Sequence, residues 1–257
     1  KKMKSHRQSQ GSYTQVPQLS SSRPLDIKTP FHLVPDNFSG TRRAVMIGIN
    51  YVGHNPGQLS GCHNDVFNMK EYIQDVHGFE DDNITLLLDD GNHTVPTHDN
   101  IIAAYENLVA SCQPGDAVFC HYSGHGGKLR DDDGDEEDGY DETLVPLDYQ
   151  RNGQIRDDDL FQILVGAFPE GVTVTCVMDC CHSGTVLDLP YVFKADGESE
   201  TMAVQPGFDF SKLGKLAAAM AAARLAAKIA SGGQINMNDI GTLVTACSGG
   251  ESPCAIL

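Results

Sequence analysis

The sequence lacks the features that mark several large classes of protein. It contains no run of 18 apolar residues, so no membrane-spanning helix is predicted. It has no positively charged start followed by an apolar segment, so no secretory signal is visible and a cytoplasmic protein is expected. Its eight cysteines include no CxxC pair, the usual spacing of a thiolate zinc site, so no such site is expected. Disulfide frameworks belong to short secreted chains, so we expect reduced thiols.

Basic residues are scarce over most of the chain. Lys and Arg number 18 against 35 Asp and Glu, a formal net charge of −17. Residues 1–43 hold eight basic and two acidic residues, a net of +6, whereas the remainder holds ten basic and 33 acidic residues, a net of −23. Nucleic-acid binding needs a basic surface, so it is not expected. An acidic body suits divalent cations or basic substrates, although it also serves solubility alone.

The chain divides into a basic arm and an alternating α/β region. Residues 1–40 are rich in Ser, Gln, Pro and Lys and indicate a flexible arm. Apolar runs predict strands at 44–49, 84–88, 117–120, 172–178 and 243–246, and helical spacing predicts helices at 65–76, 100–112, 158–165 and 213–230. Apolar strands that alternate with helices indicate an α/β fold with a parallel sheet covered on both faces.

Reactive side chains bracketed by glycines follow two of these strands. Ser123-Gly124-His125-Gly126-Gly127 follows one, and Asp179-Cys180-Cys181-His182-Ser183-Gly184 follows another. Ligand sites of parallel sheets lie at the carboxyl ends of the strands, where a His can activate a neighbouring Cys as a nucleophile. We pair His125 with Cys181, and backbone N–H groups near Gly126 would hold an oxyanion. Spacing alone does not exclude Cys180 as the nucleophile, or His121 and His182 as the base.

Two motifs carry a family resemblance over residues 43–188. His121-Tyr122-Ser123-Gly124-His125-Gly126 and Asp179-Cys180-Cys181-His182-Ser183-Gly184 resemble the histidine and cysteine motifs of metacaspases, specifically type I, within the caspase-like clan of cysteine peptidases. The resemblance implies a caspase-like three-layer α/β/α sandwich around a mostly parallel sheet. It also implies that His125 and Cys181 are catalytic and that cleavage follows Arg or Lys rather than Asp.

A pocket for a basic side chain needs carboxylates, because a guanidinium is always charged and prefers bidentate acceptors. The resemblance places Cys62, Asp65, Ser123 and Asp179 in this primary specificity pocket (S1). Asp179 precedes Cys181 by two residues and can face the same cleft. Asp65 has a structural alternative, because Asp is also a favoured N-cap of a helix.

Calcium is the expected cofactor. The resemblance implies activation by calcium through Asp141, Asp157, Asp158 and Asp188, and clustered carboxylates suit this ion. The acidic stretch 131–142 places four acids at EF-hand offsets but has Glu136 where that loop requires glycine. We therefore interpret 131–142 as a solvated charged loop.

The expected organisation is a basic arm (1–40), a large catalytic p20-like segment (41–190), a linker (191–215) and a small p10-like segment (216–257) that is shorter than the family pattern. A protease specific for basic residues could process itself, and candidate sites near or in the linker are Lys194, Lys212 and Lys215. Cys254 opens a four-residue match to a prenylation box, which we interpret as accidental, so no membrane partner is expected.

The leading hypothesis is a calcium-dependent cysteine endopeptidase that cleaves peptides and proteins after Arg or Lys, is made as a zymogen and processes itself. The alternative is a caspase-fold, calcium-responsive interaction module with little or no protease activity. We expect a monomer. Programmed cell death, stress response and protein quality control are all compatible processes.

Overall fold

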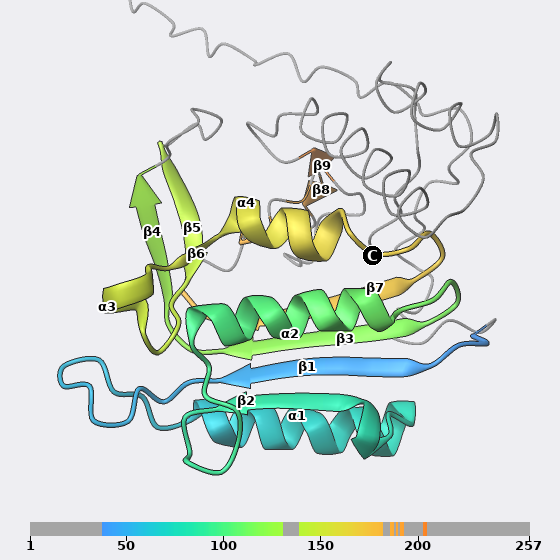
Figure 1. Cartoon of the computed structure of the whole chain (residues 1–257), viewed down its shortest axis with the longest axis horizontal. Helices are drawn as coiled ribbons and strands as arrows, with labels where there is room; N and C mark the ends of the chain where they lie inside the picture. Colours follow the sequence, from blue (N-terminus) through green and yellow to red (C-terminus); the bar gives the residue numbers. More distant parts are fainter. Residues whose placement is uncertain are drawn as a thin grey trace, which may run out of the picture.

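The computed structural model describes residues 38–130, 139–181, 186–187, 189, 191–192 and 203–204. Its centre is a sheet of four parallel strands in the order β2-β1-β3-β7 (Figure 1). The strands are β1 (Arg42–Gly48), β2 (Ile84–Leu88), β3 (Ala117–Ser123) and β7 (Thr173–Asp179). The strand order places β3, which carries the histidine motif, directly beside β7, which leads to the cysteine motif.

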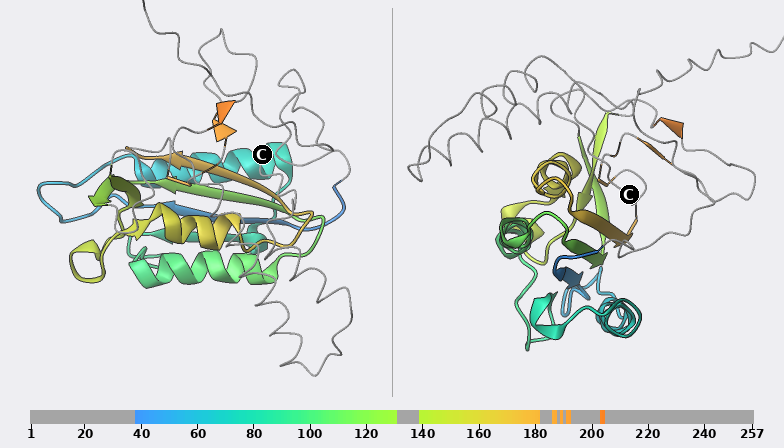
Figure 2. Two further views of the ribbon diagram at one scale, coloured as in Figure 1. Left: turned by 90° about the horizontal axis from the view of Figure 1, so that it is seen from above. Right: turned by 90° about the vertical axis from the view of Figure 1, so that its right-hand side faces the viewer.

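Helices cover both faces of this sheet. Helix α1 (Cys62–His77) lies on one face, and α2 (His98–Ser111) lies on the other together with α4 (Asp157–Leu160) and its π-helical continuation η2 (Phe161–Val165) (Figures 1 and 2). The expected three-layer α/β/α sandwich around a parallel sheet is thus confirmed.

The core explains why the strands are apolar along their whole length. Alternate residues of a strand face opposite sides of the sheet, and here both sides are covered. Val45 and Val118 belong to the cluster that includes residues of α2, whereas Met46 and Phe119 belong to the cluster that includes residues of α1. All four side chains are almost completely buried.

A second, antiparallel sheet stands at the carboxyl end of the first (Figure 1). It contains β4 (Gly126–Arg130), β5 (Tyr140–Leu144) and β6 (Ile155–Arg156) in the order β4-β5-β6. The short elements η1 (Asp81–Asn83), α3 (Tyr149–Asn152), β8 (Tyr191–Val192) and β9 (Ala203–Val204) complete the described structure. The sequence patterns had not predicted this second sheet, which begins directly after His125.

Four of the five predicted strands and three of the four predicted helices are confirmed within a few residues of their expected bounds. The predicted helix at 213–230 and strand at 243–246 lie outside the described residues. So do all but the last three residues of the 1–40 arm, the three candidate self-cleavage lysines and the 216–257 segment. Within the described ranges, no helix is long and apolar enough to span a bilayer.

Candidate active site

The two motif-bearing strands end side by side. Ser123, the last residue of β3, is the register partner of Asp179, the last residue of β7. The Gly124 N–H donates to the carbonyl oxygen of Asp179 at 3.4 Å, so the two turns that follow remain in contact. This register places the turn carrying His125 against the turn carrying Cys181.

Gly126 shows how closely these turns meet. A Cβ atom added at Gly126 would collide with the backbone carbonyl of Cys181. Only glycine allows so close an approach between two backbones. His125 and Cys181, the catalytic pair expected from the sequence, therefore lie on two turns that contact each other, and the Cys181 residue is exposed to solvent.

The orientation of His125 follows from its hydrogen bond to Gly57. The Nε2 atom lies 2.7 Å from the carbonyl oxygen of Gly57. A carbonyl oxygen only accepts hydrogen bonds, so Nε2 carries the proton and donates. In the neutral ring the lone pair is then on Nδ1, which is the tautomer that a general base using Nδ1 requires.

Two tyrosines hold the backbone of the histidine turn. The His125 N–H donates to the Tyr51 hydroxyl at 3.0 Å, and the Tyr122 hydroxyl donates to the His125 carbonyl at 2.8 Å. The Tyr51 hydroxyl in turn donates to the Val145 carbonyl at 2.7 Å, and burial raises the pKa of Tyr51 to about 12. Tyr51 therefore stays neutral and remains a donor. Sequence reasoning missed Tyr51 and Gly57, which stand far from His125 along the chain.

The alternative catalytic residues are less suitable than Cys181 and His125. Burial, together with the neighbouring Cys181 and Asp179, raises the pKa of the Cys180 thiol to about 11, so little thiolate forms there. His121 is only 2% exposed, and burial lowers its pKa despite the opposing effect of Asp179 and Asp65. His182 lies outside the described residues.

Two carboxylates expected in the specificity pocket line one hollow of about 480 Å³. Asp65 enters it from α1 and Asp179 from the end of β7. The remaining lining comes from α1, β3 and β7, namely Asn68, Met69, Tyr72, His121, Val177 and Met178. Asp65 is not the N-cap of α1, because that position is Gly61 and the Asp65 carboxylate instead accepts from the Ser123 hydroxyl at 3.0 Å. We refer to this hollow as the acidic pocket.

Ser123 and Cys62, the other two residues expected in the specificity pocket, are buried and are not among the residues that line it. The Cys62 N–H donates to the Asn50 side chain at 3.0 Å. Burial raises the pKa of the Cys62 thiol, and the nearby carboxylates of Asp65 and Asp179 raise it further against the effect of a hydrogen bond with Ser123. Ser123 therefore orients Asp65, and Cys62 is a neutral thiol beside both.

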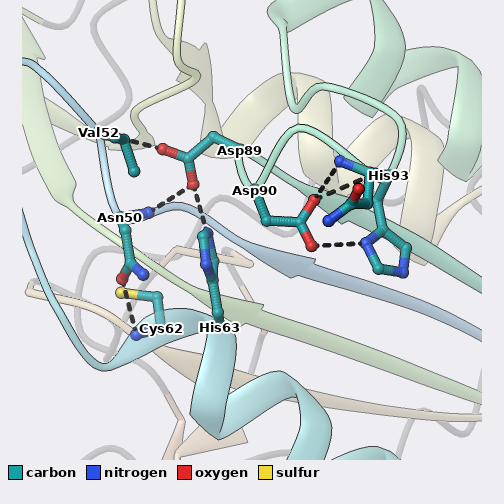
Figure 3. Close-up of polar contacts among 8 residues, drawn as sticks. Asn50, Val52, Cys62, His63, Asp89, Asp90 and His93 are labelled. Carbon is teal, nitrogen blue, oxygen red and sulfur yellow. Dashed lines mark hydrogen bonds and ion pairs between the residues drawn. The ribbon is translucent and has the colours of Figure 1, made fainter.

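The Asp89 side chain joins two segments that lie beside the site. Asp89 follows β2 and accepts from the N–H groups of Asn50 and Val52 at 2.8 and 2.9 Å and from His63 Nε2 at 2.6 Å (Figure 3). Burial acts to raise the pKa of Asp89, but these hydrogen bonds outweigh it and hold the pKa below its ordinary value. Asp89 thus fixes the loop after β1, which carries Gly57, to the start of α1. Sequence reasoning missed it.

Three of the four expected calcium ligands gather between β5 and α4. Oxygen atoms of Asp141, Asp157 and Asp158 lie within 4.8 Å of one another. The Asp157 carboxylate is 2% exposed and accepts the N–H groups of Glu142 and Asp158, each at 3.0 Å. Burial, with the charges of Asp141 and Asp158, raises the pKa of Asp157 to about 8 despite the two N–H groups that bind its carboxylate.

The donor set fits a hard cation, because calcium prefers several carboxylate oxygens. In the structure the Arg156 guanidinium pairs with Asp141. The fourth expected ligand, Asp188, and residues 131–138 lie outside the described part of the chain. The acidic stretch 131–142 is bounded by β4 and runs into β5, where an EF-hand would have helices.

Comparison with known proteins places this geometry in a family context. Residues 42–190 match the family described as "Metacaspase, peptidase C14 domain". "Metacaspase III c" of Phaeodactylum tricornutum is 62% identical over 213 residues, which cover 82% of this chain and 63% of that protein. "Metacaspase-1" of Mycosarcoma maydis is 50% identical over 163 residues, which cover 63% of this chain and 40% of that protein.

A crystal structure of protein GSU0716 from Geobacter sulfurreducens is also similar. It is 33% identical, with a TM-score of 0.45, and the match covers 57% of this chain and 53% of that one. The chain thus spans between two fifths and two thirds of the curated relatives named above. The assignment to type I stays a prediction, since the relatives carry the names Metacaspase III c and Metacaspase-1.

Proposed function

We propose, from the premise that this chain belongs to the metacaspase family, that it is a cysteine endopeptidase with Cys181 as nucleophile and His125 as general base. The observation that carries this proposal is the backbone contact between Gly126 and Cys181, which joins the two motifs into one site. The hydrogen bond from His125 to Gly57 supports it, because it leaves Nδ1 as the basic nitrogen.

The proposed reaction uses the groups of these two turns. The Cys181 thiol passes its proton to His125 Nδ1, and the thiolate attacks the substrate carbonyl carbon to form a C–S bond. The N–H groups of Gly126 and Cys181 would stabilise the oxyanion. Collapse breaks the C–N bond, His125 returns the proton to the leaving amine, and water then hydrolyses the thioester.

Specificity for Arg or Lys is supported by the charge of the acidic pocket. Asp65 and Asp179 offer carboxylates on two sides of it, and Ser123 holds the Asp65 side chain in place. A guanidinium or ammonium group compensates these charges, whereas an aspartate at the same position would be repelled.

Calcium dependence is supported by the carboxylate cluster. Asp141, Asp157 and Asp158 would hold the ion, and Asp188 is the further ligand that the family resemblance implies. When bound, calcium would supply positive charge that compensates these carboxylates and links β5 to α4. Arg156 would then release Asp141, because both cations need the same carboxylate.

Hydrolysis of fluorogenic coumarin amides with Arg, Lys or Asp before the scissile bond tests the proposal, with calcium and with chelator. We expect calcium-dependent cleavage after Arg and Lys only, and a loss of at least about 1,000-fold in Cys181→Ala. Asp157→Asn should weaken the calcium response, whereas the matched variant Asp159→Asn should retain it because Asp159 is exposed and outside the cluster.

The proposed specificity, calcium dependence and peptidase activity can each be contradicted separately. Cleavage after Asp would contradict the assignment of the acidic pocket, and equal rates with calcium and chelator would contradict the metal. A folded protein that cleaves none of the amides would favour the interaction module. Mass spectrometry of the same samples reports self-cleavage at Lys194, Lys212 or Lys215, which should occur in the wild type and not in Cys181→Ala.

A further inference from the structure

A second hollow, of about 270 Å³, lies against His125. Its walls come from the loop after β1, the start of β4 and the segment between β5 and β6. It is lined by Tyr51, His54, Pro56, Gly57, His125, Gly127, Val145, Tyr149 and Gln154. No described residue lines both this hollow and the acidic pocket.

The candidate nucleophile is close to residues of both hollows. Cys181 contacts Gly126, and the residues on both sides of Gly126, His125 and Gly127, line the second hollow. Asp179, two residues before Cys181, lines the acidic pocket. A peptide bound across Cys181 therefore lies near both hollows.

The chemistry of acyl transfer decides which hollow receives the residue before the scissile bond and which receives the residue after it. During acyl transfer the carbonyl part of the substrate stays bonded to Cys181, and its basic side chain occupies the acidic pocket with Asp65 and Asp179. The amine that departs takes its proton from His125, so its nitrogen must lie beside that ring. The chain that follows the scissile bond is then directed towards the hollow that His125 itself lines.

We propose that this second hollow is the subsite for the residue directly after the scissile bond, and that it selects a neutral apolar or aromatic side chain. This inference rests on the proposed function. Among the residues that the structure describes, the lining contains no carboxylate, in contrast to the acidic pocket, so these residues offer no counter-charge to a second basic residue. Tyr149, Pro56 and Val145 provide apolar surface on which a Leu or Phe side chain can pack.

In the wall of the second hollow, Gln154 packs closely against Thr143 and Gly127. The Thr143 hydroxyl donates to Gln154 Oε1, so the polar group that Gln154 offers is its amide nitrogen, a donor. A Cβ at Gly127 would collide with this same amide oxygen, so glycine at 127 gives Gln154 its space. A change at Gln154 should therefore alter the wall of the hollow directly.

Internally quenched peptides that share Arg before the bond and carry Leu, Phe, Gly, Lys or Glu after it test the inference. We expect kcat/KM for the Leu and Phe peptides to exceed that for the other three by about tenfold. Gln154→Glu adds a carboxylate and should raise the Lys-to-Leu ratio of kcat/KM by about fivefold or more. Tyr149→Leu should reduce the preference for Phe over Leu.

Gln162→Glu is the matched control, because it makes the same chemical change at an exposed position of η2. It should leave the Lys-to-Leu ratio as in the wild type. Each ratio is measured on one sample, so a fraction of unfolded enzyme cancels. Rates that are equal within about twofold for all five peptides, or equal shifts in both Gln variants, would overturn the inference.

The coumarin amide of Arg separates the two proposals. It has no amino acid after the scissile bond, so its cleavage reports the proposed function alone. Cleavage of this amide together with indifference to the following residue would reject the second subsite and retain the peptidase. No cleavage of the amide by folded wild type would reject the proposed function itself.

Discussion

At the scale of single residues, the geometry of the site depends on Gly126, a residue that has no side chain. Gly126 lies against the Cys181 backbone, where any side chain would require one of the two turns to move. Movement of Cys181 relative to His125 changes the geometry on which proton transfer and oxyanion binding depend.

Gly126→Ala should therefore reduce kcat/KM by about 100-fold or more, with a smaller effect on thermal stability because the site is at the end of the sheet. Gly61→Ala is the matched control, since its Cβ would meet only the Asp65 carboxylate, at an ordinary contact distance of 3.6 Å. Coumarin amide hydrolysis and thermal unfolding measure both effects. Unchanged activity in Gly126→Ala would show that the two turns are further apart than described.

The residues predicted from the sequence are those whose chemistry is local to a motif. His125 and Cys181 each follow a strand and are flanked by glycine, so both the motif and the sheet register point to them. Tyr51, Gly57 and Asp89 act through contacts that bridge tens of residues along the chain. No local pattern marks such contacts, which exist only once the strands are ordered as β2-β1-β3-β7.

At the scale of elements, Asp89 is the connection between β2, the loop after β1 and α1. Asp89→Ala should lower the free energy of unfolding by about 2 kcal/mol, because it leaves the half-buried Asn50 N–H, the Val52 N–H and the His63 ring without their acceptor. It should also reduce kcat/KM, since the loop that it holds carries the Gly57 carbonyl bound by His125. Chemical denaturation and amide hydrolysis measure the two effects.

Asp90→Ala is the control for this change. Asp90 accepts from Asn92 and His93 within its own turn (Figure 3), so we expect a loss of about 1 kcal/mol or less and full activity. The pKa of Asp89 lies below its ordinary value of 3.8, so its stabilising effect is complete above that pH and is lost as pH falls further. The stability gap between wild type and Asp89→Ala should therefore shrink below that pH.

The elements differ in how far their sequences reveal them. The strands of the central sheet are apolar on both faces, which distinguishes them from helices and loops. The sequences of β4 and β5, Gly-Gly-Lys-Leu-Arg and Tyr-Asp-Glu-Thr-Leu, show no such signal and bury Asp141 and Glu142. Acidic residues are rarely buried, so the sequence pattern pointed to a loop where the chain forms a strand.

At the scale of the whole molecule, charge should control how fast basic substrates arrive. A net charge of −17 attracts cationic peptides over distances beyond contact, and salt screens that attraction with a length of about 10 Å at 0.1 M. For peptides with one or three positive charges, kcat/KM should fall between about 20 and about 200 mM salt, and more steeply for the triply charged peptide. Equal slopes for both peptides, measured at constant calcium, would show that substrate arrival does not depend on the overall field.

Tyr51 has a consequence for how this protein can evolve. Its φ of 52° lies in the left-handed region, which glycine and asparagine adopt more readily than a bulky residue. Replacement by glycine would relieve the backbone and also remove the hydroxyl that holds His125. Tyr51 is also 2% exposed and belongs to the core, so the cavity left by glycine would cost more stability than the backbone strain that glycine relieves. Folding and turnover therefore both favour tyrosine at position 51, and selection for either demand should retain it.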